Sequence, residues 1–336
     1  MNLLLKFYYH TYNRTITRLF SFIFLVSVLS CQHAEKTKVL KLAHSLDPTH
    51  PVHKAMAFMA QRVDEKSNAK LKIDIYPSGQ LGAERECLEL LQIGSLAITK
   101  VSAAVMEGFT ETYKVFGIPY IFRDKKHSHV VMDSELGKEL LLSSEKFWLR
   151  GLCYYDAGSR SFYTKKSPIK KPEDLQGMKI RVMKSITAMN MVSALGGSPT
   201  PISWGELYTA LQAGVVDGAE NNPPSFYLSH HYEVCKYYSL DEHTTVPDVL
   251  LISTKTWNKL STEEQKWLQE AVDESVLLQR KLWEESEREA LEEVQKAGVQ
   301  VIYPDKEPFA EKVKEMYAGF MKNEKFKVLI ERIKAY

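Results

Sequence analysis

The chain has 336 residues, of which 44% are hydrophobic and 26% are charged, and its formal net charge is +2 at pH 7. This length suffices for one large core or for two lobes, and the interspersed charges give no electrostatic basis for binding nucleic acid. Beyond residue 30, no segment is apolar enough to span a bilayer, and there is no internal repeat or low-complexity run.

The N-terminus is predicted to be a signal peptide (1–30) followed by a short polar tether (31–38). Basic residues precede an apolar run, Leu19–Leu29, which is shorter than the roughly 20 residues of a membrane-spanning helix. The run ends in Leu29-Ser30-Cys31, which resembles a bacterial lipobox. We therefore expect an exported protein, anchored to a membrane by a lipid on Cys31. The alternative is an ordinary signal peptide with a coincidental cysteine.

The first series of elements alternates between strand and helix, with strands at 39–43, 71–76 and 97–101 and helices at 51–67 and 83–93. This order predicts a parallel sheet covered on both faces, and ligands of such sheets bind beyond the carboxyl ends of the strands. Four polar residues lie at those ends or at the helix starts beside them, and they are candidate ligand contacts: His44, Ser45, Glu84 and Ser102.

A second series begins after residue 155, with strands at 160–164, at 178–182 and near 198, and helices at 185–195 and 204–211. Val215-Val216 is predicted to be a brief strand, after which Asp217-Gly218 turns the chain toward Glu220 and Asn221. A later strand at 236–240 precedes His243, near the point where the chain crosses between lobes. Two similar α/β lobes imply a cleft between them.

A long helix is predicted near the C-terminus. Ser261-Thr262-Glu263-Glu264 forms a capping box, and neither Gly nor Pro follows until Gly298. At ~1.5 Å per residue this helix is roughly 50 Å long, so we expect it to lie across both lobes as a brace.

The remaining cysteines and histidines indicate neither a disulfide framework nor a metal site. Three cysteines follow residue 31, an odd number without Cys-x-x-Cys spacing, so we interpret them as small core residues. His50 and His53 have one-turn spacing but no apparent third ligand, and we interpret them as the polar start of a helix.

Arg181 is a cation on an otherwise apolar predicted strand, and a buried cation requires an anion. The planar guanidinium grips a carboxylate with two parallel hydrogen bonds, and amide donors such as Asn221 can add to that grip. Residue type alone leaves two partners open. The anion is either a ligand carboxylate or an internal acid such as Asp174 or Glu220.

Five segments stand out in chain order: Tyr76-Pro-Ser-Gly-Gln-Leu-Gly82, Gly117-Ile-Pro-Tyr-Ile-Phe122, Asp174-Leu-Gln-Gly-Met-Lys-Ile-Arg-Val182, Ser198-Pro-Thr-Pro201 and Val216-Asp-Gly-Ala-Glu-Asn221. With these segments, the chain from about Val39 to about Phe320 resembles the solute receptors of tripartite ATP-independent periplasmic (TRAP) transporters, of the DctP family. It implies an α/β, type II periplasmic-binding-protein fold with two lobes that close on a ligand by hinge motion. The predicted lobes are 39–157 plus 247–286 and 158–246 plus 287–336.

The resemblance also implies roles for particular residues. Arg181 falls on the family's carboxylate-binding arginine, and Arg160 falls on a second arginine upstream. Asn221 falls on the amide of the Glu-Asn pair, with Glu220 beside it, and Trp204 falls on an aromatic position of the site. The implied partners are the small and large subunits of a membrane permease. The protein is expected to be a periplasmic monomer without cofactor, metal or catalytic residues.

For the ligand we predict a sugar acid, with a hexuronate first and an aldonate or keto-aldonate next. Sialate-binding members carry an acidic residue where this chain has Ser102, which disfavours sialate, and carboxylates such as Glu84 and Glu220 would repel the second charge of a C4-dicarboxylate. Trp204, by contrast, offers an aromatic face to a sugar ring.

Two other classes of protein compete with a receptor. Glu84 and Glu220 could serve as the acid/base pair of an exported hydrolase, but no further catalytic motif accompanies them. A sensory domain would be expected to continue into a signalling segment, whereas this chain ends at Tyr336.

Overall fold

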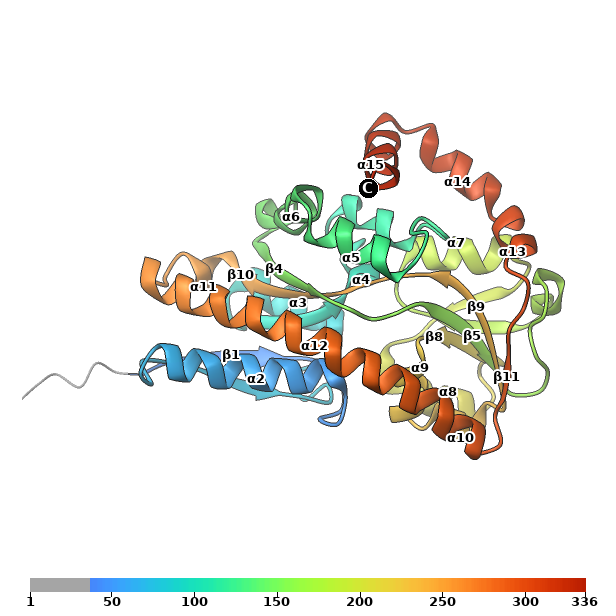
Figure 1. Cartoon of the computed structure of the whole chain (residues 1–336), viewed down its shortest axis with the longest axis horizontal. Coiled ribbons are helices and arrows are strands. Elements are labelled where there is room, and N and C mark those ends of the chain that lie inside the picture. Colours follow the sequence, from blue (N-terminus) through green and yellow to red (C-terminus); the bar gives the residue numbers. More distant parts are fainter. Residues whose placement is uncertain (1–36) are drawn as a thin grey trace, which may run out of the picture. The chain divides into compact units, whose positions relative to one another are not determined.

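The computed structural model in Figure 1 describes residues 37–336. The predicted signal peptide, Cys31 and most of the predicted tether lie outside the described residues. Between residues 37 and 336, each helix is too short or too polar to cross a bilayer.

Two β-sheets organise residues 39–336, and each sheet with its covering helices is called a lobe below. The sheet of lobe I has the order β2 (Leu71–Tyr76), β1 (Lys38–Ala43), β3 (Ile98–Ser102), β10 (Asp248–Ser253), β4 (Leu149–Tyr155). The sheet of lobe II has the order β11 (Gln300–Ile302), β9 (Tyr237–Thr244), β5 (Arg160–Thr164), β8 (Gly218–Asn221), β6 (Lys179–Val182), β7 (Ser198–Pro201). The predicted two-lobe α/β fold is confirmed.

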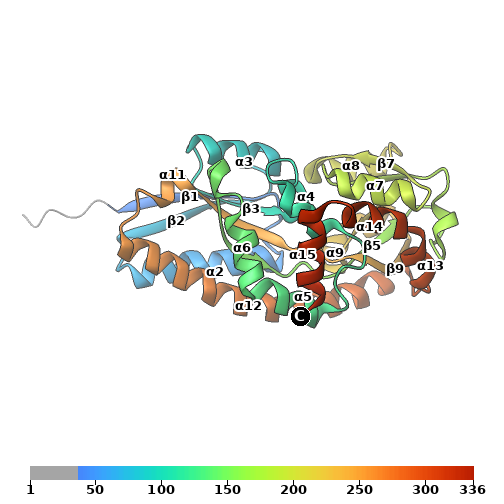
Figure 2. The same ribbon diagram turned by 90° about the horizontal axis from the view of Figure 1, so that it is seen from above.

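Helices cover both sheets, and Figure 2 shows them from above. Those associated with lobe I are α2 (Pro51–Lys66), α3 (Glu84–Ile93), α4 (Ala103–Met106), η1 (Glu111–Gly117), α5 (Lys125–Asp133), α6 (Glu135–Leu142), η2 (Glu145–Phe147) and α11 (Thr254–Trp257). Those associated with lobe II are η3 (Pro172–Leu175), α7 (Ile186–Ala194), η4 (Trp204–Glu206), α8 (Leu207–Gln212), α9 (Pro223–Leu228), α10 (His231–Val234) and α13 (Glu307–Lys312).

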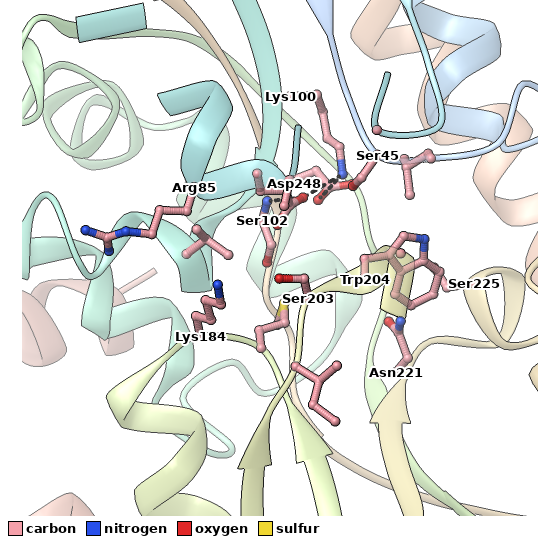
Figure 3. A pocket seen from close by; sticks show the side chains of 18 of the residues that line it. Ser45, Arg85, Lys100, Ser102, Lys184, Ser203, Trp204, Asn221, Ser225 and Asp248 are labelled. Carbon is pink, nitrogen blue, oxygen red and sulfur yellow. Dashed lines mark hydrogen bonds and ion pairs between the residues drawn. The ribbon is translucent and has the colours of Figure 1, made fainter. Parts of the chain in front are cut away.

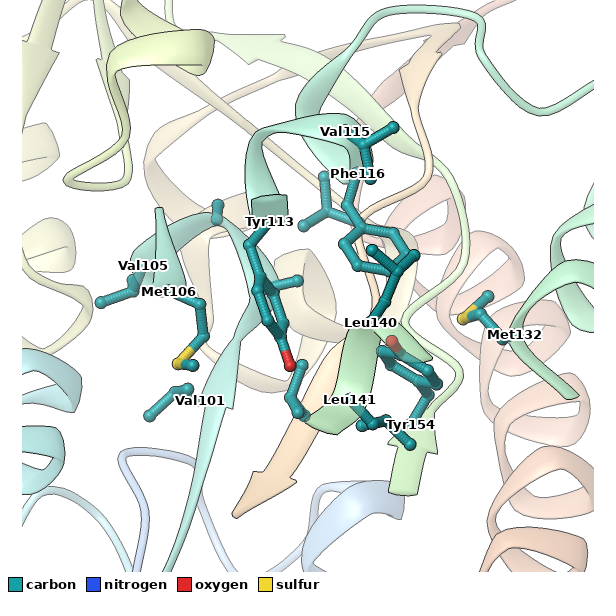
Figure 4. Packing of buried hydrophobic residues seen from close by; sticks show 14 of the residues in the cluster. Val101, Val105, Met106, Tyr113, Val115, Phe116, Met132, Leu140, Leu141 and Tyr154 are labelled. Carbon is teal, nitrogen blue, oxygen red and sulfur yellow. The ribbon is translucent and has the colours of Figure 1, made fainter. Parts of the chain in front are cut away.

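The core of lobe I contains a dense aromatic cluster. Figure 4 shows Tyr113, Phe116 and Tyr154 packed with Leu140. The rings of Phe116 and Tyr154 lie 5.4 Å apart, and the Tyr154 hydroxyl donates to the Gly137 carbonyl at 3.0 Å. Because the polar tip of Tyr154 is satisfied, the ring can be buried without the cost of an unpaired hydroxyl.

The predicted long helix is α12, which runs from Thr262 to Lys296 and begins with the Ser261 capping box. Its 35 residues span ~50 Å at ~1.5 Å per residue. Leu268 and Val272 join a core cluster of lobe I, and Val294 joins a cluster of lobe II. The same helix therefore braces both lobes, as Figure 1 shows.

The last helices cross from lobe II back to lobe I. Phe309 of α13 packs in a lobe II cluster, α14 (Lys314–Met321) follows, and α15 (Glu324–Lys334) buries Phe326 and Ile330 in the core of lobe I. His127 of α5 contacts the carbonyl of Ile333 at 2.9 Å. This differs from the predicted assignment of 287–336 to the second lobe, because the apolar face of α15 fills a groove of the first.

Two sheet details differ from the sequence-based expectations. β10 runs antiparallel to β3 and β4, so the lobe I sheet is mixed rather than parallel. The predicted strand at Val215-Val216 is wrong, because the strand begins at Gly218, where a turn was expected. A Cβ on Gly218 would lie 2.3 Å from the carbonyl oxygen of Tyr163, so this glycine permits close strand pairing.

Candidate ligand-binding site

A cavity of about 460 Å³ lies between the two lobes. This volume is within the roughly 300–1,000 Å³ of small-molecule sites. Figure 3 shows Lys100, Ser102 and Asp248 entering from lobe I and Trp204 and Asn221 from lobe II. Residues from both sheets are needed to close the site, so its shape depends on how the lobes meet.

Arg181 lines the lobe II wall from β6 and is 2% exposed. Its Nε donates to the Ile202 carbonyl at 2.8 Å, whereas its buried Nη1 has no hydrogen-bond partner among the described residues. No described carboxylate lies within ion-pair distance of it, and burial lowers its pKa. Arg181 is therefore a buried cation whose charge the protein leaves uncompensated, and such a group favours an anionic ligand.

Aromatic side chains lie beside Arg181. The guanidinium carbon of Arg181 lies 5.9 Å from the centre of the Trp204 ring. Behind Trp204, the ring of His231 lies 5.2 Å away, and its Nδ1 lies 2.9 Å from the hydroxyl of Tyr163. Burial, with a contribution from Arg181, lowers the pKa of His231 to about 3. This imidazole is therefore neutral at pH 7 and adds no charge to the site.

Arg160 takes the internal pairing that was considered for Arg181. Its Nη2 donates to Glu220 Oε1 at 2.9 Å and to the Glu220 carbonyl at 2.7 Å, and its Nε also contacts the carboxylate. Glu220 lies 3.5 Å from His243, which in turn lies 2.8 Å from Asp241. The four side chains form a buried row of alternating charge. Arg160 reaches the cavity, whereas Glu220 is not among its lining residues.

Asn221 ends β8 at the cavity and is oriented by its neighbours. Its Oδ1 accepts from Arg160 Nη1 at 2.8 Å and from the backbone amide of Asn222 at 2.9 Å. Because both of these groups are donors, the side-chain oxygen faces them and the amide nitrogen is left to donate elsewhere. Arg160 thus acts on the site by orienting Asn221.

The lobe I wall carries a cluster of acidic and basic side chains, Glu84, Lys100 and Asp248. The ammonium of Lys100 lies 3.1 Å from Asp248 Oδ1 and 3.4 Å from Glu84 Oε1. Glu84 Oε1 also accepts from the backbone amide of Ser102 at 3.1 Å. Burial raises the pKa of Glu84, while the charge of Lys100 opposes that shift. Glu84 and Ser102 were predicted site residues, and both line the cavity.

Sequence reasoning missed Lys100 and Asp248. Lys100 is a lysine inside an apolar strand, a signal of the same kind as Arg181. Asp248 begins a strand that runs antiparallel to β3 and pairs with Ser102. Asp248 therefore lies at the edge where the parallel strands end, although it is the first residue of its own strand. The rule that ligands bind at the carboxyl ends of parallel strands does not identify such a residue.

Of the remaining predicted contacts, Ser45 lines the cavity and His44 does not. His44 Nδ1 accepts from the Leu46 amide at 3.1 Å, and its Nε2 lies 3.0 Å from His53. Burial lowers the pKa of His44 to about 3. His50, which was interpreted only as a helix start, does line the cavity and lies 3.4 Å from Ser225 of lobe II.

The lobes also touch beside the cavity. Glu107 follows α4 in lobe I, and its carboxylate accepts from the Ser185 hydroxyl at 2.9 Å and from the Thr187 amide at 3.2 Å. Both groups belong to the N-terminus of α7 in lobe II. This contact and the one between His50 and Ser225 join the two lobes through hydrogen bonds.

The described residues form no group of three or more His, Cys, Asp or Glu side chains that could hold a metal ion. The cysteines among them are free and buried, as the spacing predicted: Cys87, Cys153 and Cys235. The arrangement offers an unpaired guanidinium, an amide donor and an indole on one wall and carboxylate oxygens on the other. These groups suit the binding of an organic anion that also carries hydroxyls.

The chain is similar to known solute-binding proteins along most of its length. A sequence model of the DctP family, bacterial extracellular solute-binding protein family 7, matches residues 42–324. The uncharacterized protein YiiZ of Salmonella typhimurium is 40% identical over 312 residues, which cover 92% of this chain and 94% of YiiZ.

Solved structures of TRAP periplasmic solute-binding proteins share the fold. One from Xanthobacter autotrophicus, with bound β-D-galacturonate, is 39% identical with a TM-score of 0.85 and covers 88% of this chain and 99% of its own. Another from Anaerococcus prevotii, with bound D-glucuronate, is 37% identical with a TM-score of 0.87 and covers 89% and 98%. The chain therefore belongs to the DctP family of bacterial extracellular solute-binding proteins, the receptors of TRAP transporters.

Proposed function

We propose that this receptor binds a sugar acid, a hexuronate such as glucuronate or galacturonate, with the carboxylate held by Arg181. The observation that carries the proposal is the buried, unpaired guanidinium of Arg181 at the cavity wall. Hexuronates bound to two of the similar structures support this choice of ligand.

The proposed mechanism begins with the carboxylate entering between the lobes. Arg181 donates to it bidentately, and the amide nitrogen of Asn221 adds a further donor. The indole of Trp204 packs against the sugar ring. Closure of the lobes removes water, which strengthens each charge-assisted hydrogen bond. In this mechanism, ligand binding drives closure of the lobes and involves no chemical step. We therefore propose that the protein has no enzymatic activity.

Delivery to the membrane is the part of the proposal that rests on the family and on the N-terminal sequence. We infer that the closed receptor docks on the small and large permease subunits of a TRAP transporter. We also infer that acylation of Cys31 tethers this periplasmic protein to a membrane, at a position outside the described residues.

The test is ligand-induced thermal stabilisation of the wild-type protein and of Arg181→Ala, measured with glucuronate, galacturonate, succinate and sialate. A ligand at 100 times its Kd stabilises the folded state by about 2.7 kcal/mol. We expect a hexuronate to raise the Tm of the wild type. Loss of two charge-assisted hydrogen bonds, each worth about 1.5–3 kcal/mol, should weaken binding to Arg181→Ala by at least about 100-fold.

The controls separate binding from folding. Arg62→Ala removes an arginine that pairs with Glu274 between α2 and α12, away from the cavity, and should leave the ligand response intact. The ligand-free Tm of Arg181→Ala should equal or exceed that of the wild type, because an uncompensated buried charge is removed. A hexuronate affinity unchanged in Arg181→Ala would refute the clamp. Stabilisation by succinate alone would refute the choice of ligand.

A further inference from the structure

The cluster of Glu84, Lys100 and Asp248 faces the cavity from the wall opposite Arg181. Lys100 is 2% exposed and Asp248 is 7% exposed, so both are buried groups rather than surface charges. Two carboxylates surround one ammonium, and the formal charge of the cluster is −1. The cavity thus has an uncompensated positive wall on lobe II and a net negative wall on lobe I.

Each carboxylate of the cluster keeps one oxygen available. Lys100 takes Oδ1 of Asp248, and Lys100 with the Ser102 amide takes Oε1 of Glu84. No hydrogen bond from a described residue reaches Oδ2 of Asp248 or Oε2 of Glu84. These oxygens accept hydrogen bonds and have none to donate, so they suit hydroxyl groups and repel a second carboxylate.

Two further cations line the cavity, Arg85 and Lys184, and neither pairs with Glu84 or Asp248 as Lys100 does. Arg85 lies 5.2 Å from the centre of the Phe109 ring and pairs with Glu89 at 3.1 Å. In Figure 3 its side chain points away from Asp248. Lys184 is an exposed residue of lobe II that also lines the cavity. It defines the competing arrangement, a dicarboxylate that spans Arg181 and Lys184.

We propose that Asp248 and Glu84, held by Lys100, form the hydroxyl-recognising end of the site and make the receptor reject dicarboxylates. The inference rests on the proposed function, because it assumes that Arg181 holds the carboxylate of the ligand. Lys100 acts as a positioning residue. It fixes both carboxylates and leaves their outer oxygens directed to ligand hydroxyls.

The test is selectivity, measured by isothermal titration calorimetry with D-glucuronate and succinate. Asp248→Asn keeps the shape of the side chain and the acceptor for Lys100 but neutralises the wall. A hydrogen bond to a charged group contributes roughly 10- to 100-fold in affinity, so glucuronate should bind at least about tenfold more weakly. Succinate binding should strengthen, so the ratio of the two Kd values should shift by more than about tenfold.

Two further variants distinguish a change in ligand selectivity from a defect in folding. Glu84→Gln removes a carboxylate that does not lie in a strand, and it should shift the ratio in the same direction. Asp273→Asn removes an acid of α12 outside the cavity and should leave the ratio unchanged. A role in folding alone would weaken both ligands equally. An unchanged ratio in Asp248→Asn and Glu84→Gln would overturn the inference.

The wild-type titrations separate this inference from the proposed function. If glucuronate binds and succinate does not, the function stands and the variants decide the role of the cluster. If both ligands bind equally well, the exclusion of dicarboxylates is refuted. In that case, loss of succinate binding in Lys184→Ala would show that succinate binds with one carboxylate at Arg181 and the other at Lys184. If no hexuronate binds, the proposed function fails and the inference fails with it.

Discussion

Glu220→Gln should destabilise the receptor even without ligand, because Glu220 balances a buried arginine. Arg160 and Glu220 are 5% and 1% exposed, and Nη2 of Arg160 makes two hydrogen bonds to Glu220, at 2.7 and 2.9 Å. Breaking such a pair by removing one charge costs about 3–5 kcal/mol. Burial by itself raises the pKa of Glu220, but Arg160 and His243 lower it to about 2 from 4.5, and this shift corresponds to about 3 kcal/mol.

The assay is thermal unfolding of the ligand-free protein at pH 7. A loss of 3 kcal/mol should lower the Tm by at least about 6 °C, since 1 kcal/mol shifts the Tm of a large domain by roughly 2–4 °C. The stabilisation from Glu220 is present above pH 4.5 and is lost as the pH falls through about 2. The difference between variant and wild type should therefore shrink in acid.

The matched control is Glu274→Gln, which removes a carboxylate that pairs with Arg62 and Lys66 at the surface and should change the Tm little. If Glu220 were a ligand contact rather than a structural ion-pair partner, its substitution would have a different effect. Its removal would leave the ligand-free Tm unchanged and lower only the ligand affinity. That pattern in Glu220→Gln would refute the structural role and restore Glu220 as a ligand residue.

Two further predictions concern the pH dependence and the C-terminal helix. Burial alone lowers the pKa of His243, but Asp241 and Glu220 raise it to about 9, so its stabilisation is complete below pH 6.5 and is lost as the pH rises through about 9. The Tm should fall over this range, and a slope equally steep in His243→Asn would contradict the assignment. Phe326→Ala should cost about 3–5 kcal/mol, measured by urea unfolding, because Phe326 is 3% exposed in the lobe I core. Val328→Ala, at 44% exposure on the same helix, should cost no more than about 0.5 kcal/mol, and equal losses would mean that α15 does not pack on lobe I.

Local sequence signals determined the elements that depend on nearby residues. The helix-ending glycine at 94, the capping box at Ser261 and the alternation in 71–76 each act through neighbours in the chain, and the structure has α3, α12 and β2 at these places. The resemblance in five segments likewise identified the family. The sequence did not predict that α15 packs on lobe I. The pattern of an amphipathic helix shows which face is buried but not which lobe it packs against.

The sequence alone also identified Arg181 as a buried cation that needs an anion, but it left the source of that anion open. Strand register shows that Glu220, one of the internal acids considered, pairs with Arg160 instead. β5 pairs antiparallel with β8, which sets Phe162 against Glu220 and brings Arg160 onto that carboxylate. β6 lies parallel to β8 on its other side, with Arg181 opposite Ala219. An alanine has no charge to offer, so of the two arginines only Arg181 is left facing the cavity without an internal carboxylate among the described residues.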